Sequence, residues 1–311
     1  DKGRSHLTEI SQHSMIARSS DYRRGVVLVV LAGVCWSSMG VGIRFMEVAN
    51  VWQILFFRSC ALMPFLLLVI SFRSKGKSLA AIRKSGLAGI VGGAALVMAF
   101  SGGIYSIQVT SVANAMILFA AAPLIAAVLG WIILREVVRK ATWIAIAVAL
   151  AGISVMVWEG ISLGFLYGNV AALLSALGFA SFTIALRWRK LDDMMPTVFL
   201  GGVFATVVSG LVCTSAGYSL NIPTNDILIS LALGVFQVGA GLVLYTMGSK
   251  AVPAAELALL SLGEVILGPL WVWLILGETA GIYTLLGGAI LLAAIAGNAL
   301  SGLRRKPVPI L

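Results

Sequence analysis

Charged residues are scarce in this sequence of 311 residues: Asp, Glu, Lys and Arg make up 11% of it, against roughly 25% in soluble domains. Hydrophobic residues make up 60%. This balance excludes an ordinary water-soluble domain. The apolar residues come in runs of about 20, the length with which an α-helix crosses roughly 30 Å of hydrocarbon. The composition therefore predicts an integral membrane protein built from helices.

Histidine and cysteine are also rare, which limits the available chemistry. The two histidines, His6 and His13, lie in a polar N-terminal tail. Cys35, Cys60 and Cys213 lie singly within apolar runs, with the spacing of neither a disulfide framework nor a metal site. We therefore interpret the cysteines as packing residues and expect no metal and no cofactor.

The motifs of nucleotide-driven or catalytic proteins are missing. The sequence has no Walker loop and no Gly-rich dinucleotide turn. A membrane enzyme would need His, Cys or clustered acids within reach of one another, and the neighbouring acids Asp192 and Asp193 lie among basic residues of an interfacial loop. We therefore expect that this chain is not an enzyme. The net charge of +10 does not predict a nucleic-acid partner, because the basic residues flank membrane runs.

Glycine, proline and charge divide the chain into ten candidate spans. We expect a polar tail over 1–24, a first five-helix repeat over 25–158, a second over 165–302 and a tail over 303–311. Met15 offers a natural start of the chain, so we expect residues 1–14 to be an addition before it, and we assign them no functional role. The predicted spans are 25–46, 51–72, 86–107, 110–134, 141–158, 165–188, 196–217, 227–248, 252–276 and 280–302.

Nearly all of the 22 Lys and Arg residues fall in the tails and in alternate loops, on one side of the predicted membrane. Cytoplasmic loops retain Lys and Arg, so we expect both termini to be cytoplasmic. The expected location is a bacterial inner membrane, crossed several times. The loops of the other side contain acids instead, namely Glu47, Glu159, Asp226 and Glu278.

An internal repeat joins the ends of the fourth and ninth spans. "WIILRE" begins at Trp131 and recurs as "WLILGE" from Trp273, 142 residues later (273 − 131); we call this spacing the repeat offset. Arg44 and Arg187, at the ends of the first and sixth spans, are a weaker echo. Because a unit of five helices is odd, the second copy enters the membrane inverted. Inverted repeats are typical of secondary transporters, with the substrate site between the halves.

These features resemble the drug/metabolite transporter superfamily, in its two-repeat, ten-helix EamA-type branch, and most closely its YddG-type exporters of aromatic and neutral amino acids. The resemblance rests on the paired endings, on Arg58 in "FFRSCALMPF", and on "AAPLIAAVLGW" against "GEVILGPLWVW". It implies an all-α fold with a central cavity, lined by helices 1, 3, 4, 6, 8 and 9. Members often have Glu-Pro where this chain has Glu264-Val265, which moves the expected break of helix 9 to Pro269.

Glu264 lies near the middle of its span, where a charge costs roughly 2.5 to 3.5 kcal/mol. Three interpretations remain open: a ligand or proton carrier facing a wet cavity, an ion pair with Arg58, and a buried neutral acid. Glu256, nearly two turns earlier, either lines the same pathway or is a solvated helix-end acid near Lys250.

Other polar and aromatic residues within spans are candidates for a cavity lining. Asn114 is the mate of Glu256 at the repeat offset, and it either binds substrate or bridges helices, as does Gln237. Met98, Ser101, Tyr105 and Gln108 form one helical stripe. Aromatic rings lie away from the interfaces where Trp and Tyr usually gather. The aromatic candidates are Trp36, Phe119, Phe182 and Tyr245, with Phe100, Phe179 and Trp271 also within spans.

The sequence thus predicts a secondary transporter that exports aromatic and other neutral amino acids by alternating access. An exporter of lipophilic cations is the alternative, and a polytopic membrane enzyme is a more distant one. The expected partners are a small-molecule substrate and the lipid bilayer. The oligomeric state stays open, with a monomer as one option.

Overall fold

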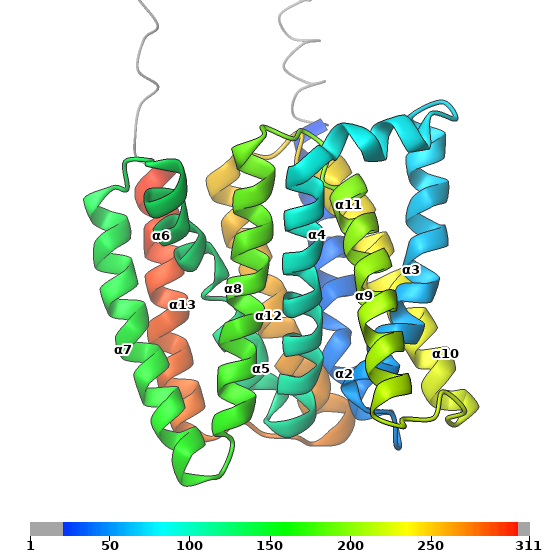
Figure 1. The fold of residues 1–311 in the computed structure, drawn as a ribbon. Helices are drawn as coiled ribbons and strands as arrows, with labels where there is room; N and C mark the ends of the chain where they lie inside the picture. The colour runs from blue at the N-terminus through cyan, green and yellow to red at the C-terminus, as the bar shows by residue number, and fades with distance from the viewer. Residues whose placement is uncertain (1–20, 304–311) are drawn as a thin grey trace, which may run out of the picture.

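A computed structural model describes residues 21–303, except the side chains of residues 254, 255 and 303. Every regular element in this part of the chain is a helix, and ten helical spans are long and apolar enough to cross a membrane (Figure 1). The spans are Asp21–Arg44, which ends in α2 (Met39–Arg44); α3 (Val51–Arg73); α4 (Ser78–Val109); α5 (Val112–Phe119) with α6 (Ala122–Leu134); α7 (Lys140–Ser162); α8 (Leu166–Trp188); α9 (Met195–Ser215); α10 (Thr224–Ala232) with the π-helix η1 (Leu233–Ala240) and α11 (Gly241–Gly248); α12 (Ala254–Leu276); and α13 (Ile282–Leu303).

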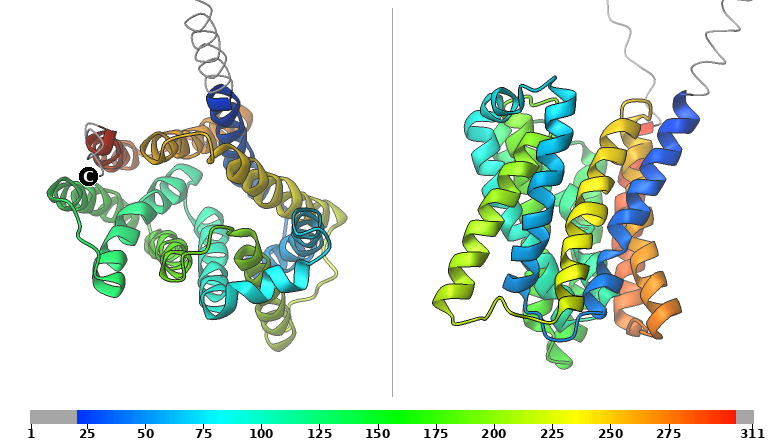
Figure 2. Two further views of the ribbon diagram at one scale, coloured as in Figure 1. Left: turned by 90° about the horizontal axis from the view of Figure 1, so that it is seen from above. Right: turned by 90° about the vertical axis from the view of Figure 1, so that its right-hand side faces the viewer.

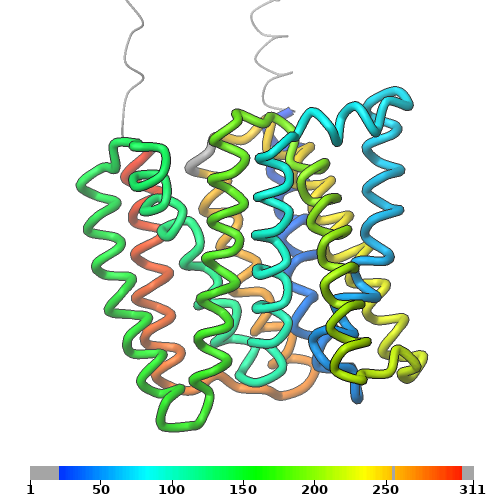
Figure 3. The backbone as a smooth tube through the Cα atoms, in the orientation of Figure 1, coloured from blue at the N-terminus to red at the C-terminus, as the bar shows by residue number. Residues whose placement is uncertain are grey.

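The spans run up and down a single bundle, and both ends of the described chain lie at the same end of it (Figure 3). We call this the termini end and the other the opposite end. The loops predicted to be basic lie at the termini end, and the loops at residues 45–50, 110–111 and 277–281 lie at the opposite end. The all-α fold of ten spans, a multi-pass membrane protein, is therefore confirmed.

Local signals set the starts of several helices. Asn50 and Gln53 form a reciprocal capping box at the start of α3. Ser111 caps α5 by accepting the Asn114 N–H at 3.1 Å. Gly86 has a φ of +51° and kinks α4, so that residues 78–85 lie across the termini end while the rest of α4 crosses the bundle (Figure 1). The predicted third span began at this glycine.

The packing of α7 against α13 shows the inverted repeat directly. A Cβ placed on either Gly152 or Gly287, in the middle of the two helices, would lie 2.5 Å from the carbonyl oxygen of the other. Thr142, at the start of α7, donates to Asn298 Oδ1 at 2.8 Å. Its mate at the repeat offset, Thr284 at the start of α13, donates to Glu159 Oε2 at 2.9 Å. A threonine at the start of each helix thus donates to a side chain near the end of the other helix, an arrangement that agrees with two inverted five-helix repeats.

The helix breaks near proline differ from the expectation for the ninth span, which is α12. α12 continues through Pro269, so the predicted break there is wrong. The break lies in the fourth span instead, where α5 ends at Phe119 and α6 begins at Ala122. Pro123 occupies the first turn of α6, where its missing N–H costs no helical hydrogen bond. Inside α12 the freed carbonyl can be satisfied locally, as is common in membrane helices.

Asp226, expected in a loop, lies in the first turn of α10 and is fully buried. Its carboxylate accepts the backbone N–H groups of Glu47, Val48 and Ala49 at 2.9, 3.0 and 2.9 Å. Three charge-assisted hydrogen bonds replace the water that a loop position would have supplied. Asp226 therefore fixes the loop after the first span to α10.

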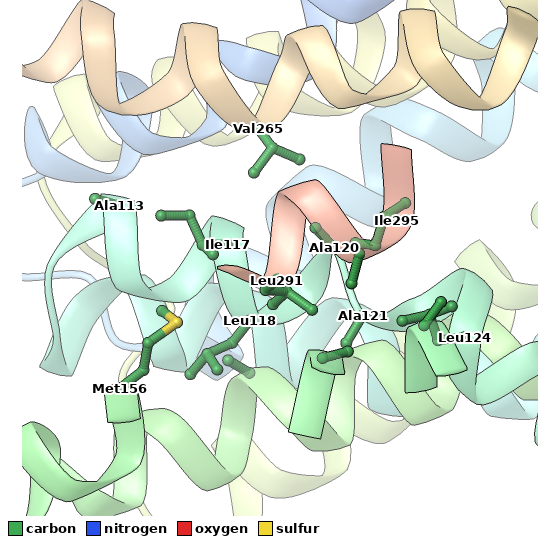
Figure 4. Close-up of a cluster of buried hydrophobic side chains, with 14 residues drawn as sticks. Ala113, Ile117, Leu118, Ala120, Ala121, Leu124, Met156, Val265, Leu291 and Ile295 are labelled. Atoms are coloured by element: carbon green, nitrogen blue, oxygen red, sulfur yellow. The ribbon is translucent and has the colours of Figure 1, made fainter. Parts of the chain in front are cut away.

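α5 is held at the centre of the bundle by an apolar cluster. Leu118 of α5 and Leu291 of α13 are fully buried, and Met156 of α7 and Val265 of α12 approach them from two further helices (Figure 4). Burial of such side chains contributes roughly 1.5 to 3 kcal/mol each where water is the alternative. In a bilayer the gain comes instead from close packing. The cluster fixes the position of α5, which carries Asn114 and Phe119.

Candidate functional site

The termini-end half of the bundle consists of two walls. The first span, α11 and α12 form one wall, and α4 and α8 form the other, with α5 beside them from mid-span to the opposite end (Figure 1; Figure 2, left). The walls meet near the opposite end, where α12 packs against α5 and α2, and α4 packs against α5. Side chains that point between the walls are the candidates for contact with a transported molecule.

Three of the predicted residues come together on the first wall. The rings of Trp36 and Tyr245 lie 5.3 Å apart, centroid to centroid, and Tyr245 lies near Glu264. Gly241 makes room for the indole, since a Cβ placed there would lie 2.4 Å from Trp36 Nε1. Glu264 packs beside Gly33 of the first span, at 3.9 Å from a Cβ placed on that glycine. This wall thus presents an acid beside two aromatic rings.

The second wall carries a row of three phenylalanines. The ring of Phe179 on α8 lies 5.6 Å from that of Phe119 and 5.6 Å from that of Phe182. Phe182 is 3% exposed, whereas Phe179 is 39% exposed although it lies between two other rings of the bundle. This exposure indicates open space beside Phe179. Phe179 follows Trp36 at nearly the repeat offset, so the two walls carry an aromatic ring at matching turns.

Glu264 has no ion partner among the described side chains. Its Oε2 is buried and accepts no hydrogen bond from the part of the chain that the structure describes. Arg58, the expected alternative partner, forms no ion pair with it: the guanidinium lies over the ring of Phe100, 4.5 Å from the centroid. Arg58 is 1% exposed, and its Nε and Nη2 also lack a hydrogen-bond partner among the described residues. The two deep charges belong to separate environments.

The predicted stripe on α4 divides into residues with different surroundings. Gln108 donates to the Ala49 carbonyl at 2.8 Å and so ties α4 to the loop after the first span. Ser101 donates to the Val97 carbonyl of its own helix at 2.8 Å. Tyr105 is 38% exposed, and Met98 is half-buried. Of the polar residues of this stripe, Tyr105 is the most exposed.

Asn114, Gln237 and Glu256 lie apart from the two aromatic groups. Asn114 donates to Thr110 Oγ1 at 3.0 Å and to Asn169 Oδ1, and so bridges α5 and α8. Glu256 accepts a hydrogen bond of 2.6 Å from the Tyr22 hydroxyl, which joins the first span to α12. Gln237 is buried in η1, and its Oε1 has no partner within residues 21–303.

A pocket of about 450 Å³ lies at the opposite end, and of the predicted cavity-lining residues it is lined by Gln108 and Asn114. Arg44 and Glu278 line it and form an ion pair. The sequence signalled both residues, because each belongs to an ending that recurs in the second repeat. In the described part of the chain, no three His, Cys, Asp or Glu side chains gather as a metal site would need.

Two inverted five-helix repeats with an acid and aromatic rings in the interior are the architecture typical of secondary transporters. The chain belongs to the EamA-like transporter family, whose profile matches residues 23–158 and 166–300. Each matched segment covers one of the two repeats. The predicted EamA-type family is therefore confirmed, whereas the YddG-type subfamily stays a prediction.

Comparison with known proteins gives similar chains, among them a curated relative and a solved structure. The chain is 27% identical over 188 residues to the uncharacterized transporter YwfM of Bacillus subtilis (strain 168); this match covers 58% of the chain but only 62% of the relative, less than two thirds of it. A crystal structure of a protein 20% identical in sequence superimposes with a TM-score of 0.64, over 93% of this chain and 100% of that one. At that identity the likeness supports the fold alone.

Proposed function

We propose that this protein exports aromatic and other neutral amino acids across a bacterial inner membrane by alternating access. The observation that carries the proposal is Glu264 beside Trp36 and Tyr245, with its buried Oε2 free of hydrogen bonds from residues 21–303; the exposed ring of Phe179 on the second wall adds to it. A buried carboxylate without a partner is costly. A cationic group that enters between the walls would remove that cost.

A zwitterionic amino acid matches the groups on the two walls. Its ammonium group would pair with Glu264 and lie near the face of Trp36, which attracts cations by its quadrupole. An aromatic or apolar side chain would rest on Phe179. Its carboxylate would accept the hydroxyl protons of Tyr105 or Tyr245. All of these groups come from one chain, so the proposal needs no second copy.

A phosphorylated substrate matches the interior poorly. Within the described spans, Arg58 is the basic residue deep in the bundle, and it is 1% exposed beneath Phe100. Two negative charges would need several such groups within reach.

Counterflow into liposomes that contain the purified protein tests the proposal. We expect labelled phenylalanine, tryptophan and methionine to exchange without ATP. Trp36→Ala should reduce flux of the aromatic substrates more than that of threonine. Trp158→Ala is the matched control, since Trp158 is 75% exposed on the peripheral helix α7 and should leave both fluxes unchanged.

The alternative substrate class is the lipophilic cation, which the same unpaired Glu264 and aromatic faces also favour. The same liposomes separate the two classes. Exchange of lipophilic cations without exchange of any amino acid would refute amino-acid export and support the alternative. Absence of both activities in folded protein would refute both.

A further inference from the structure

Each end of the bundle carries an Arg–Glu ion pair, and the repeat relates one pair to the other. Arg44 pairs with Glu278 at the opposite end, and Arg187 pairs with Glu136 at the termini end. In both cases the arginine closes the first helix of one repeat, and the glutamate follows the fourth helix of the other. The residues before the glutamates, Arg135 and Gly277, both adopt left-handed backbone, with φ of +55° and +69°.

The opposite-end pair is docked onto a third element. Arg44 Nε lies 2.7 Å from Glu278 Oε2. Arg44 Nη2 also donates to the Thr110 carbonyl at 2.6 Å, and the Val112 N–H donates to Glu278 Oε1 at 2.8 Å. Thr110 and Val112 form the turn from α4 into α5, so the carboxylate sits at the N-terminus of α5, where a helix favours negative charge. The pair therefore holds the end of the first span, the end of α12 and the α4–α5 turn together.

The termini-end pair is formed, but Arg187 donates no hydrogen bond to the carbonyl of the described residue Val252. Arg187 and Glu136 have side chains 45% and 40% exposed, against 24% and 25% for the docked pair. Neither makes a further side-chain hydrogen bond to residues whose side chains the structure describes. At the repeat offset, Thr110 and Val112 correspond to Val252 and Ala254, the turn from α11 into α12. That turn belongs to the first wall, while Arg187 and Glu136 end helices that are continuous with the second (Figure 2).

We infer that these four residues are the gate residues of the transporter, and that docking of one pair on its turn closes one end. The inference rests on the proposed alternating access. The structure is the state closed at the opposite end. In the alternate state, Arg187 donates to the Val252 carbonyl and Glu136 accepts the Ala254 N–H, which joins the two walls at the termini end. Arg44 and Glu278 then leave Thr110 and Val112, and the opposite end opens.

One distance reports which state is populated. It joins Val137, which follows Glu136 after α6, to Lys250, which precedes the turn from α11 into α12. Both residues are exposed. Spin labels on cysteines at these positions, with Cys35, Cys60 and Cys213 replaced by alanine, give the distance distribution in liposomes by pulsed electron paramagnetic resonance. We expect a long distance to dominate in the starting protein. Arg44→Gln and Glu278→Gln should each raise the ratio of the short to the long component about tenfold or more, which corresponds to about 1.4 kcal/mol.

The partner variants and a control complete the experiment. Glu136→Gln, added to Arg44→Gln, should return the distribution to the long distance, because the closed termini end loses its docking group. Arg139→Gln is the control: Arg139 bonds to Asn298 at the same end, at 3.2 Å, outside the gate, and should change nothing. An unchanged distribution in folded Arg44→Gln and Glu278→Gln protein would overturn the inference. The measurement needs no transported substrate, so failure of amino-acid export leaves it intact.

Discussion

At the scale of single residues, Glu264 and Arg58 are two charged side chains deep in the bundle that form no ion pair with each other. Glu264 lies beside Trp36 and Tyr245 of the first wall, whereas the Arg58 guanidinium lies over Phe100. The insertion cost alone predicted that both residues need an explanation. It did not predict their partners, because pairing depends on helix rotation that sequence periodicity leaves open.

Glu264→Gln tests the role of the carboxylate. The amide has nearly the same shape but cannot attract an ammonium group as a carboxylate does. We expect normal folding, with apparent affinity for neutral amino acids in counterflow reduced about tenfold or more, given about 1.5 to 3 kcal/mol for a hydrogen bond to a charged group. Glu47→Gln, in the exposed loop after the first span, is the control. Wild-type affinity and an unchanged pH profile in Glu264→Gln would exclude the proposed role.

Arg58→Met tests whether Arg58 is a strut. Because the guanidinium has no ion partner, an apolar side chain of similar volume should keep or raise thermal stability. Its effect should add to that of Glu264→Gln within about 0.5 kcal/mol, as for independent sites. The measurement is thermal unfolding of the two single variants and the double variant in detergent. Recovery of stability only in the double variant would instead reveal a pair that the structure does not show.

At the scale of elements, the π-helix η1 determines how closely the eighth span (α10, η1 and α11) approaches α3. A Cβ placed on Gly234 would lie 2.2 Å from the Arg58 carbonyl oxygen, so only glycine fits at this contact. π-helical segments often mark functional sites. Here the wide turn brings Gly234 and the unpartnered Gln237 into the interior of the bundle.

Gly234→Ala should destabilise the protein, because the backbone of α3 has to move to admit the methyl group. Overpacking of this kind costs roughly 1 to 3 kcal/mol, and thermal unfolding in detergent measures it. Gly263→Ala on α12 is the matched control, since no atom lies within 4 Å of a Cβ placed there. It should be neutral or stabilising, because alanine favours a helix over glycine. Equal effects of the two substitutions would show that the η1–α3 contact is not tight.

The sequence predicted the elements far better than their interruptions. All ten spans were found, because length and hydropathy are properties of the segment itself. The π segment, the continuity of α12 through Pro269 and the break before Pro123 were not predicted, because each depends on what the neighbouring helices supply. Asp226 was misplaced for the same reason: its solvation comes from amides almost 180 residues away in the chain.

At the scale of the whole molecule, the bias of basic residues toward the termini end predicts the orientation in the membrane. Reporter fusions after Lys77, Arg139 and Lys190 should be cytoplasmic, because Lys and Arg are retained on that side. Fusions after Glu47, Gly164 and Tyr218, which lie in loops of the other end, should be periplasmic. A reversed pattern would leave the fold unchanged but would turn the proposed exporter around.

The sequence predicted the types of residue in the candidate site, but only some of the residues that form it. Trp36, Tyr245 and Glu264 do lie together, and Phe119 and Phe182 share a cluster. Phe179, which joins that cluster and is more exposed, was ranked below them, since composition does not show which face of a helix borders open space. The docking of Arg44 and Glu278 on the α4–α5 turn depends on contacts between repeats. Sequence comparison within the chain showed only that both residues recur.

Side-specific labelling of a cysteine at Phe179 tests the central claim that a pathway between the two walls opens at the termini end and binds neutral amino acids. The protein would carry Phe179→Cys with its native cysteines replaced, in membrane vesicles of both orientations. We expect a membrane-impermeant thiol reagent to react when it is added on the side of the termini end, and phenylalanine to slow that reaction. From the other side the reaction should be at least about tenfold slower. Reaction from neither side, or a rate that no amino acid changes, would contradict the account.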